Sequence, residues 1–227
     1  MYDIRPTADQ IPADLIAGLL ATDTGTIGHF LDAGFMDPGM QGRMPGAKIA
    51  GTAVTVQVTV PDSLTAHYAL KFTRPGDILV VERGVDQRTS CWGGTSSAGA
   101  IRAGLAGLIM DGAGNDISEA NAVGLPIWCR HVTPITTKYR DLGGALNVPI
   151  SCGGVVVNPG DAILADENGV LVIPRARIKQ VIDEAVTFGK KEQDFRAFLR
   201  DNPDMAYPDA SGSSAMIEAK LKEQARQ

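Results

Sequence analysis

An acidic residue closes a glycine-rich segment in the middle of the chain, where residues 111–116 read DGAGND. Two glycines let the backbone approach a ligand closely, and the amides at the start of the helix expected over 117–122 favour an anion. The carboxylate of Asp116 could also hold a divalent cation, because magnesium takes one or two carboxylates together with water and substrate oxygens. A local role is the alternative. Asp116 and Glu119 have the spacing of a capping box, in which Asp116 would only accept hydrogen bonds from helix amides.

A second glycine pair stands in the segment 88–97, which reads RTSCWGGTSS. If a helix begins at this pair, the backbone amides that follow it form a cradle for a carboxylate group. The alternative is that the glycines only allow a helix to pack closely on a strand. The first interpretation predicts a substrate-binding set made of Gly94, Thr95, Ser96 and Asn115.

A carboxylate substrate needs a cation to offset its desolvation, and two arginines are near in sequence. Arg88 lies in the loop that leads to the glycine pair and is the predicted carboxylate clamp. Arg102 lies two turns into the expected helix and should point away from its start, so it is the weaker candidate. His67 is interpreted as a structural histidine among apolar neighbours, and Cys91 as a packed thiol without an activating partner.

Hydrophobic patterning indicates the elements that position these residues. Apolar runs at 48–60, 78–81, 105–110 and 125–130 predict strands, with short helices over 62–72, 93–103 and 117–122 between them. This alternation is typical of an α/β sheet with a parallel component, whose sites lie beyond the carboxyl ends of the strands. Asn168-Gly169 between two apolar runs predicts a hairpin. Two short helices are expected over 11–33, a long amphipathic helix over 175–201, and a final helix over 215–226 after a Pro- and Ser-rich linker.

Composition narrows the class of protein. The 227 residues carry a net charge of −5 without a basic cluster, which argues against a nucleic-acid partner. No window approaches the roughly 18 uninterrupted apolar residues of a membrane span, so no membrane contact is predicted. The 3 cysteines form no Cys-x-x-Cys pair, and this favours a reducing compartment. We therefore expect a cytoplasmic protein.

Several segments occur in the order found in a known family. The chain resembles the RraA-like family, which includes the regulator of ribonuclease E activity A and divalent-metal pyruvate aldolases. Those aldolases act on 4-hydroxy-4-methyl-2-oxoglutarate and 4-carboxy-4-hydroxy-2-oxoadipate. The resemblance covers roughly residues 47–192 and implies a swivelling β/β/α-type domain with a mixed sheet, followed by a long C-terminal helix. It also implies trimers or hexamers with sites between subunits. The segments that carry it read PGD (75–77), WGG (92–94), LAGLIMDG (105–112), GLP (124–126), NVPISCGGVVVNPGD (147–161) and ADENG (165–169).

The aldolases of this family share a motif made of an acid, 20 intervening residues, and Arg-Asp. By that resemblance Asp116 is the metal-ligating Asp, and Glu192 on the long helix matches a Glu that a neighbouring subunit contributes. Two motif positions differ here, because Asn115 stands at the Arg and Gly94 stands at the first acid. A neutral Asn cannot replace a bidentate guanidinium clamp.

The predicted function follows from these residues together. We expect residues 1–201 to form one α/β domain, with the N-terminal helices in 1–36 and the long helix at 175–201, and residues 202–227 to contact another subunit. The predicted activity is a Mg²⁺- or Mn²⁺-dependent carbon–carbon lyase, an aldolase or decarboxylase, acting on a small 2-oxo acid that differs from the usual family substrates. The alternative is a noncatalytic binding or regulatory protein on the same scaffold.

Overall fold

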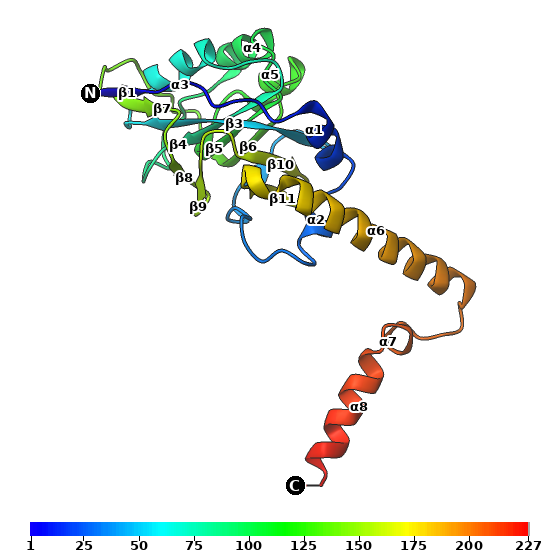
Figure 1. The fold of residues 1–227 in the computed structure, drawn as a ribbon. Helices are drawn as coiled ribbons and strands as arrows, with labels where there is room; N and C mark the ends of the chain where they lie inside the picture. The colour runs from blue at the N-terminus through cyan, green and yellow to red at the C-terminus, as the bar shows by residue number, and fades with distance from the viewer. Residues whose placement is uncertain (227) are drawn as a thin grey trace. The chain divides into compact units, whose positions relative to one another are not determined.

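A mixed nine-stranded sheet forms the core of the unit Met1–Glu184 in the computed structural model, which describes residues 1–226 (Figure 1). Within these residues the strand order is β1-β7-β3-β4-β5-β6-β2, and the β10–β11 hairpin joins the sheet by pairing β10 with β3. A separate pair, β8 and β9, is antiparallel. The strands are β1 Tyr2–Ile4, β2 Gln41–Gly42, β3 Ile49–Val58, β4 Asp77–Glu82, β5 Gly107–Gly114, β6 Ile127–Val132, β7 Gly144–Leu146, β8 Ile150–Cys152, β9 Val155–Val157, β10 Ala162–Asp166 and β11 Gly169–Ile173.

Parallel pairing of β3, β4, β5 and β6 produces the strand–helix alternation that the sequence predicts. Helices α3, α4 and α5 connect these strands. The helices are α1 Ala13–Leu20, α2 Thr24–Ile27, α3 Leu64–Tyr68, α4 Gly94–Arg102, α5 Ile117–Ala122, α6 Ile178–Asp201, α7 Tyr207–Ala210 and α8 Ser213–Gln224, with 3₁₀ turns at Ala69–Lys71 and Arg175–Arg177. The expected α/β class with a mixed sheet and a long C-terminal helix is confirmed.

The central strands are buried on both faces, which explains their continuous apolar runs. In β4, Leu79 and Val81 belong to a core cluster that includes residues of α3, α4 and α5. Ile78 and Val80, on the opposite face, belong to a second cluster that includes β10 and β11. Helices therefore cover one face of the parallel strands, and the β10–β11 hairpin, which continues the sheet beyond β3, packs together with β8–β9 against the other face.

The structure contains the predicted hairpin, and two predicted element boundaries differ from those observed. The β10–β11 hairpin is confirmed, with Asp166 opposite Gly169 at its turn. The turn predicted at 111–116 is wrong, because β5 continues to Gly114. Parallel pairing with β6 resumes at Ala113 after an irregularity beyond Met110, and these ladder bonds hold the glycines in strand geometry. The helix predicted over 62–72 is shorter, since its second half is the 3₁₀ turn Ala69–Lys71.

The chain consists of two compact units, Met1–Glu184 and Ala185–Gln227, and the boundary between them falls inside α6. In the second unit the Phe195 ring contacts the rings of Phe198 and Tyr207. Helix α8 has no buried residue among those described. None of the helices within residues 1–226 combines the length and apolar character that a membrane span requires. The subunit contact expected for 202–227 stays a prediction.

Candidate functional site

A cavity of about 480 Å³ lies at the carboxyl ends of the parallel strands. Its wall is formed by the first turn of α4, by α3, and by the loops that follow β4 and β6. Asp116, two residues beyond the end of β5, reaches it as well. Open α/β sheets bind their ligands at this edge, where the loops after neighbouring strands converge.

The start of α4 presents backbone amides to the cavity. The first intrahelical hydrogen bond runs from the Ser97 N–H to the Gly93 carbonyl, so the amides of Thr95 and Ser96 precede it. The Ser96 hydroxyl is occupied locally, since it accepts from the Gly93 N–H and donates to the Gly93 carbonyl at 2.9 Å each. Gly94, Thr95 and Ser96 all line the cavity, as the carboxylate cradle requires. Their contribution is therefore the helix N-terminus, which attracts anions.

Asp116 directs its carboxylate at this same helix start. Its Oδ2 accepts a hydrogen bond of 3.2 Å from the Gly94 N–H. The backbone of Asp116 is left-handed, with φ of 51°, and its side chain makes no capping bond to α5. The capping interpretation of Asp116 and Glu119 is therefore wrong, because the left-handed backbone turns the carboxylate away from the α5 amides and towards α4.

Glu119 lies where a side chain at position 94 would have to be. A Cβ placed on Gly94 would be 2.8 Å from Glu119 Cβ and 2.9 Å from its carboxyl carbon, and would overlap Oε2. A Cβ on Gly93 would lie 2.8 Å from Asp116 Oδ2. Because Gly93 and Gly94 have no side chains, the carboxylates of Asp116 and Glu119 can both lie against the start of α4. This role of Glu119 was not predicted from the sequence, although an acid three residues after Asp116 and the missing acid at position 94 were signals for it.

Asn115 is buried and serves as a structural link. Its Nδ2 donates to the Thr133 carbonyl at 2.7 Å, and its N–H donates to the Trp92 carbonyl at 3.2 Å. It is not among the described residues that line the cavity, although a substrate-binding role was predicted. These bonds connect the end of β5 to the loops on either side.

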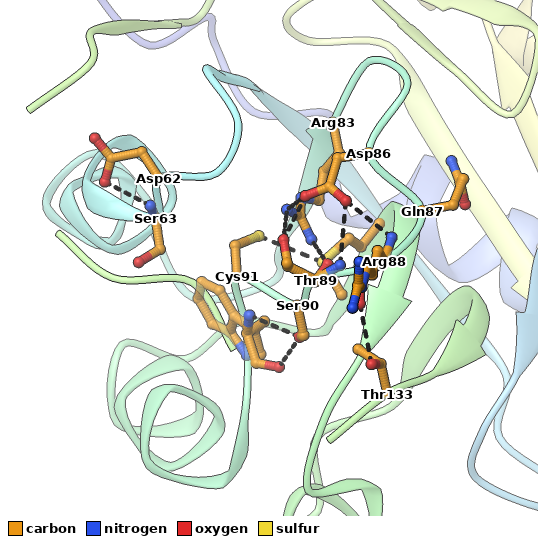
Figure 2. A network of polar contacts seen from close by, with 12 residues as sticks. Asp62, Ser63, Arg83, Asp86, Gln87, Arg88, Thr89, Ser90, Cys91 and Thr133 are labelled. Carbon is orange, nitrogen blue, oxygen red and sulfur yellow. Dashed lines mark hydrogen bonds and ion pairs between the residues drawn. The ribbon is translucent and has the colours of Figure 1, made fainter. Parts of the chain in front are cut away.

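Figure 2 shows the loop that carries Arg88, which is organised around Asp86. The Asp86 carboxylate accepts from the N–H of Arg88 at 2.8 Å and pairs with the buried guanidinium of Arg83 at 2.9 Å. Burial raises the pKa of Asp86. The Thr89 hydroxyl, the backbone N–H groups of Arg88 and Thr89, and the Arg83 charge lower it by more. Arg88 itself is exposed and lies outside the described lining of the cavity. No contact of its side chain with the cavity supports the predicted clamp.

His67 and Tyr139 form a hydrogen-bonded pair in the cavity wall, from α3 and from the loop after β6. His67 Nδ1 lies 2.9 Å from the Tyr139 hydroxyl, and Nε2 lies 3.1 Å from the Cys91 carbonyl. The Trp92 ring packs edge-on against the imidazole. Burial lowers the pKa of His67 below its usual value, opposed by the Cys91 carbonyl and by the charge of Asp62.

Asp62 fixes the loop that holds Tyr139. Its carboxylate accepts from the backbone N–H groups of Arg140 at 3.3 Å and Leu142 at 2.9 Å, and also from those of Ser63 and Leu64 at the start of α3. On the other side of Tyr139, the Thr137 N–H donates to the Ser90 carbonyl. The tyrosine is thereby tethered on both sides in sequence.

Known proteins match this chain in sequence and in fold. The model of the RraA-like family, described as Aldolase/RraA, matches residues 23–172. The chain belongs to the RraA-like family. It is 38% identical over 146 residues to a provisionally named 4-hydroxy-4-methyl-2-oxoglutarate aldolase of Halalkalibacterium halodurans, a match that covers 64% of this chain and 67% of that protein. It is 32% identical to the 4-hydroxy-4-methyl-2-oxoglutarate aldolase of Thermus thermophilus over 128 residues, 56% of this chain and 77% of that one.

A solved member of the family confirms the architecture of this RraA-like chain. Streptomyces coelicolor RraAS2, described as an unusual member of the RNase ES inhibitor RraA protein family, superimposes with a TM-score of 0.75 at 29% identity. The match covers 83% of this chain and 98% of that one. Aldolases and a ribonuclease inhibitor family are therefore both among the named relatives.

The residues present fit a divalent ion of the kind an RraA-like aldolase implies. No group of three or more His, Cys, Asp or Glu side chains within residues 1–226 is arranged to enclose a metal. Asp116 and Glu119 nevertheless bring two carboxylates to one helix start, and that of Asp116 lines the cavity; magnesium tolerates such a site because it retains waters. Glu192, the predicted partner-derived ligand, lies in the second unit, where it pairs with Arg196 at 3.5 Å.

The cysteines offer no alternative chemistry. All 3 are buried and unpaired. Burial raises the pKa of Cys91 to about 11, so the thiol stays protonated at neutral pH and is a poor nucleophile. The interpretation of Cys91 as a packed thiol agrees with this environment.

Proposed function

We propose that this RraA-like chain is a divalent-metal-dependent lyase that cleaves a carbon–carbon bond in a small 2-oxo acid and releases pyruvate. The observation that carries the proposal is the meeting of the Asp116 and Glu119 carboxylates at the glycine pair that opens α4. Two carboxylates beside the helix amides that line the cavity would provide a cation site next to an anion site.

Each part of the site has a distinct task in this reaction. Asp116 and Glu119 would hold Mg²⁺ or Mn²⁺, with Glu192 of a neighbouring subunit as a proposed further ligand. When bound there, such an ion would supply Lewis-acid chemistry at the 2-oxo group and would stabilise negative charge on its oxygen. The amides of Thr95 and Ser96 bind the adjacent carboxylate of the substrate. Asn115 stands where the aldolase motif of the family has Arg, so the site lacks that guanidinium and the accepted substrate should differ in shape or charge.

Pyruvate release tests the proposal directly. A panel of 4-hydroxy-2-oxo acids and oxaloacetate is assayed with Mg²⁺, with Mn²⁺ and with a chelator. Turnover that requires the metal and is abolished in Asp116→Ala supports the lyase. Absence of turnover with every substrate and metal refutes it.

The predicted contact of Arg88 with the substrate carboxylate can be tested separately. If the Arg88 guanidinium clamps the substrate in solution, Arg88→Ala should raise KM about tenfold or more, as expected for loss of a charge-assisted bond. Unchanged kinetics would leave the carboxylate to the α4 amides alone.

A regulatory binding protein is the second candidate, and one observation favours it. Asn115 is committed to Thr133 and Trp92, so the family's arginine position is filled by a structural residue. If the parent chain is inactive while Asn115→Arg combined with Gly94→Asp, and with Glu119→Gly to clear the space at position 94, gains metal-dependent cleavage, the scaffold serves binding rather than catalysis.

A further inference from the structure

We propose that Tyr139 is the residue that takes the proton from the hydroxyl group of a 4-hydroxy-2-oxo acid, and that His67 receives the proton of Tyr139 in turn. This inference rests on the proposed lyase function and deepens it, because cleavage beside a hydroxyl-bearing carbon requires removal of that proton. The aldolase motif offers no acid for this purpose here, since position 94 is glycine.

The hydrogen bonds around His67 determine which way its protons point. A carbonyl oxygen can only accept, so the 3.1 Å contact between Nε2 and the Cys91 carbonyl places a proton on Nε2. In the neutral imidazole Nδ1 is then the acceptor, and the Tyr139 hydroxyl donates to it across 2.9 Å. The lone pairs of the Tyr139 oxygen remain to accept a hydrogen bond from another group.

The surroundings leave His67 neutral and place one carboxylate where it offsets part of the cost of charging the ring. Burial keeps the pKa of His67 low, so the imidazole is neutral and able to accept at neutral pH. When it becomes charged, the Asp62 carboxylate stabilises the imidazolium, since its charge raises the pKa of His67. Asp62 also anchors Arg140 and Leu142, on one side of Tyr139 in sequence, so one carboxylate positions the loop and balances the charge.

Tyr139 and the carboxylate site share the cavity. Tyr139 and His67 line it together with Asp116, Thr95 and Ser96. A substrate whose oxo-acid end occupies the α4 amides and the carboxylates can therefore extend its hydroxyl-bearing carbon along the same cavity. Tyr139 is exposed, at 65%, so a substrate can reach its side chain.

The proposed step conserves atoms and charge. The C4 hydroxyl proton moves to the Tyr139 oxygen while the Tyr139 proton moves to His67 Nδ1. The C3–C4 bond breaks, its electron pair forms the C2–C3 double bond of the pyruvate enolate, and C4 becomes the carbonyl carbon of the departing product. The proton returns from His67 through Tyr139, and protonation of C3 completes pyruvate.

Two reactions of one enzyme separate this role from a structural one. Oxaloacetate decarboxylation generates the same enolate but has no hydroxyl proton to remove. Tyr139→Phe retains the ring that packs on His67 and removes only the hydroxyl. We expect aldol cleavage by this variant to fall about 100-fold, within the usual range for general acid–base catalysis, and decarboxylation to fall much less. Lys138→Ala, on the same exposed loop, is the control and should change neither reaction.

The pH dependence of the two reactions distinguishes a proton-accepting role of His67 from a purely structural one. Protonation of His67 removes its acceptor, so kcat/KM for aldol cleavage should fall on the acid side, below the ordinary histidine value of about 6.5. The groups that face His67 are Asp62, Tyr139 and the Cys91 backbone, and Asp116 lines the same cavity. Decarboxylation should lack this limb. In His67→Gln, which does not titrate, the limb should disappear from the residual aldol cleavage as well.

A measurement without turnover distinguishes failure of this proposal from failure of the proposed function. The probe 2,4-dihydroxyglutarate lacks the 2-oxo group but keeps the C4 hydroxyl, and 2-hydroxyglutarate lacks that hydroxyl. The first should shift the ¹⁵N resonance of His67 Nδ1 in the parent and not in Tyr139→Phe, and the second should leave it unchanged. Equal loss of both reactions in Tyr139→Phe, or equal shifts with the two probes, would overturn the proposal. An inactive parent that still shows the selective shift would refute the lyase function and leave the hydroxyl-recognising pair in place.

Discussion

Removal of the Asp62 carboxylate should loosen the loop that carries Tyr139 and destabilise the fold. Asp62 is 1% exposed and accepts four backbone hydrogen bonds of 2.6 to 3.3 Å. Two of them, from Arg140 and Leu142, join segments 78 and 80 residues apart. Hydrogen bonds to charged groups contribute about 1.5 to 3 kcal/mol each, so losing these two long-range bonds in Asp62→Ala should cost about 3 to 6 kcal/mol.

The asparagine variant should lie between alanine and the parent. An amide oxygen at Oδ1 could still accept from Ser63, Leu64 and Arg140, but the amide nitrogen at Oδ2 would face the Leu142 N–H. We expect Asp62→Asn to cost about 2 kcal/mol. Asp141→Asn is the matched control, because Asp141 is exposed on the same loop and asparagine tolerates its left-handed backbone, φ 57°.

Chemical and thermal unfolding measure these costs. For a unit of this size about 1 kcal/mol corresponds to roughly 2–4 °C in Tm, so Asp62→Ala should lower Tm by about 6 °C or more. A loss below about 1 kcal/mol, or a cost of Asp62→Asn equal to that of Asp141→Asn, would refute the anchoring role of the carboxylate.

The same carboxylate predicts a pH dependence. Burial raises the pKa of Asp62, but the backbone N–H groups of Leu142, Leu64, Ser63 and Arg140 lower it by more, so the folded-state pKa lies below the unfolded value. The stabilisation is therefore fully present above the unfolded pKa of about 3.9 and is lost as pH falls through the folded pKa. The free-energy difference between parent and Asp62→Asn should be constant from about pH 5 to 8 and shrink below about pH 4. A difference that persists unchanged at pH 2 would show that the charge is not its source.

Three further outcomes follow from the structure. Magnesium should raise the Tm of the parent. Glu119→Gln should reduce that rise, whereas the exposed control Glu218→Gln should not. A tenfold weaker affinity for the metal removes about 1.4 kcal/mol of the stabilisation by bound metal. An equal rise in both variants would exclude Glu119 as a ligand. The buried thiols, with the pKa of Cys91 at about 11, should react with a thiol reagent at pH 8 only on unfolding, and fast labelling of the native protein would contradict their burial. Light scattering should return three or six times the chain mass of 23.9 kDa, whereas a value near 23.9 kDa would refute the predicted oligomer.

Local sequence was sufficient for most elements of the fold. Apolar runs bounded by glycine and proline predict β4 and β6 because strands buried on both faces need apolar residues throughout. Asn168-Gly169 predicts the β10–β11 turn because a short-range backbone conformation selects those residues. The extension of β5 to Gly114 could not be predicted in this way. It depends on pairing with β6, which overrides the turn preference of glycine.

The resemblance to the aldolase motif also predicted that Asp116 and position 94 belong to one site, since that motif joins an acid to Arg-Asp across 20 intervening residues. Only the tertiary structure decided how the site is completed. The Glu119 carboxylate occupies the space above Gly94, and Asn115 is buried in structural bonds. His67 and Tyr139 meet although 72 residues separate them. These are contacts between loops that follow different strands, and their geometry is set by the order of strands in the sheet, which no local pattern of residues encodes.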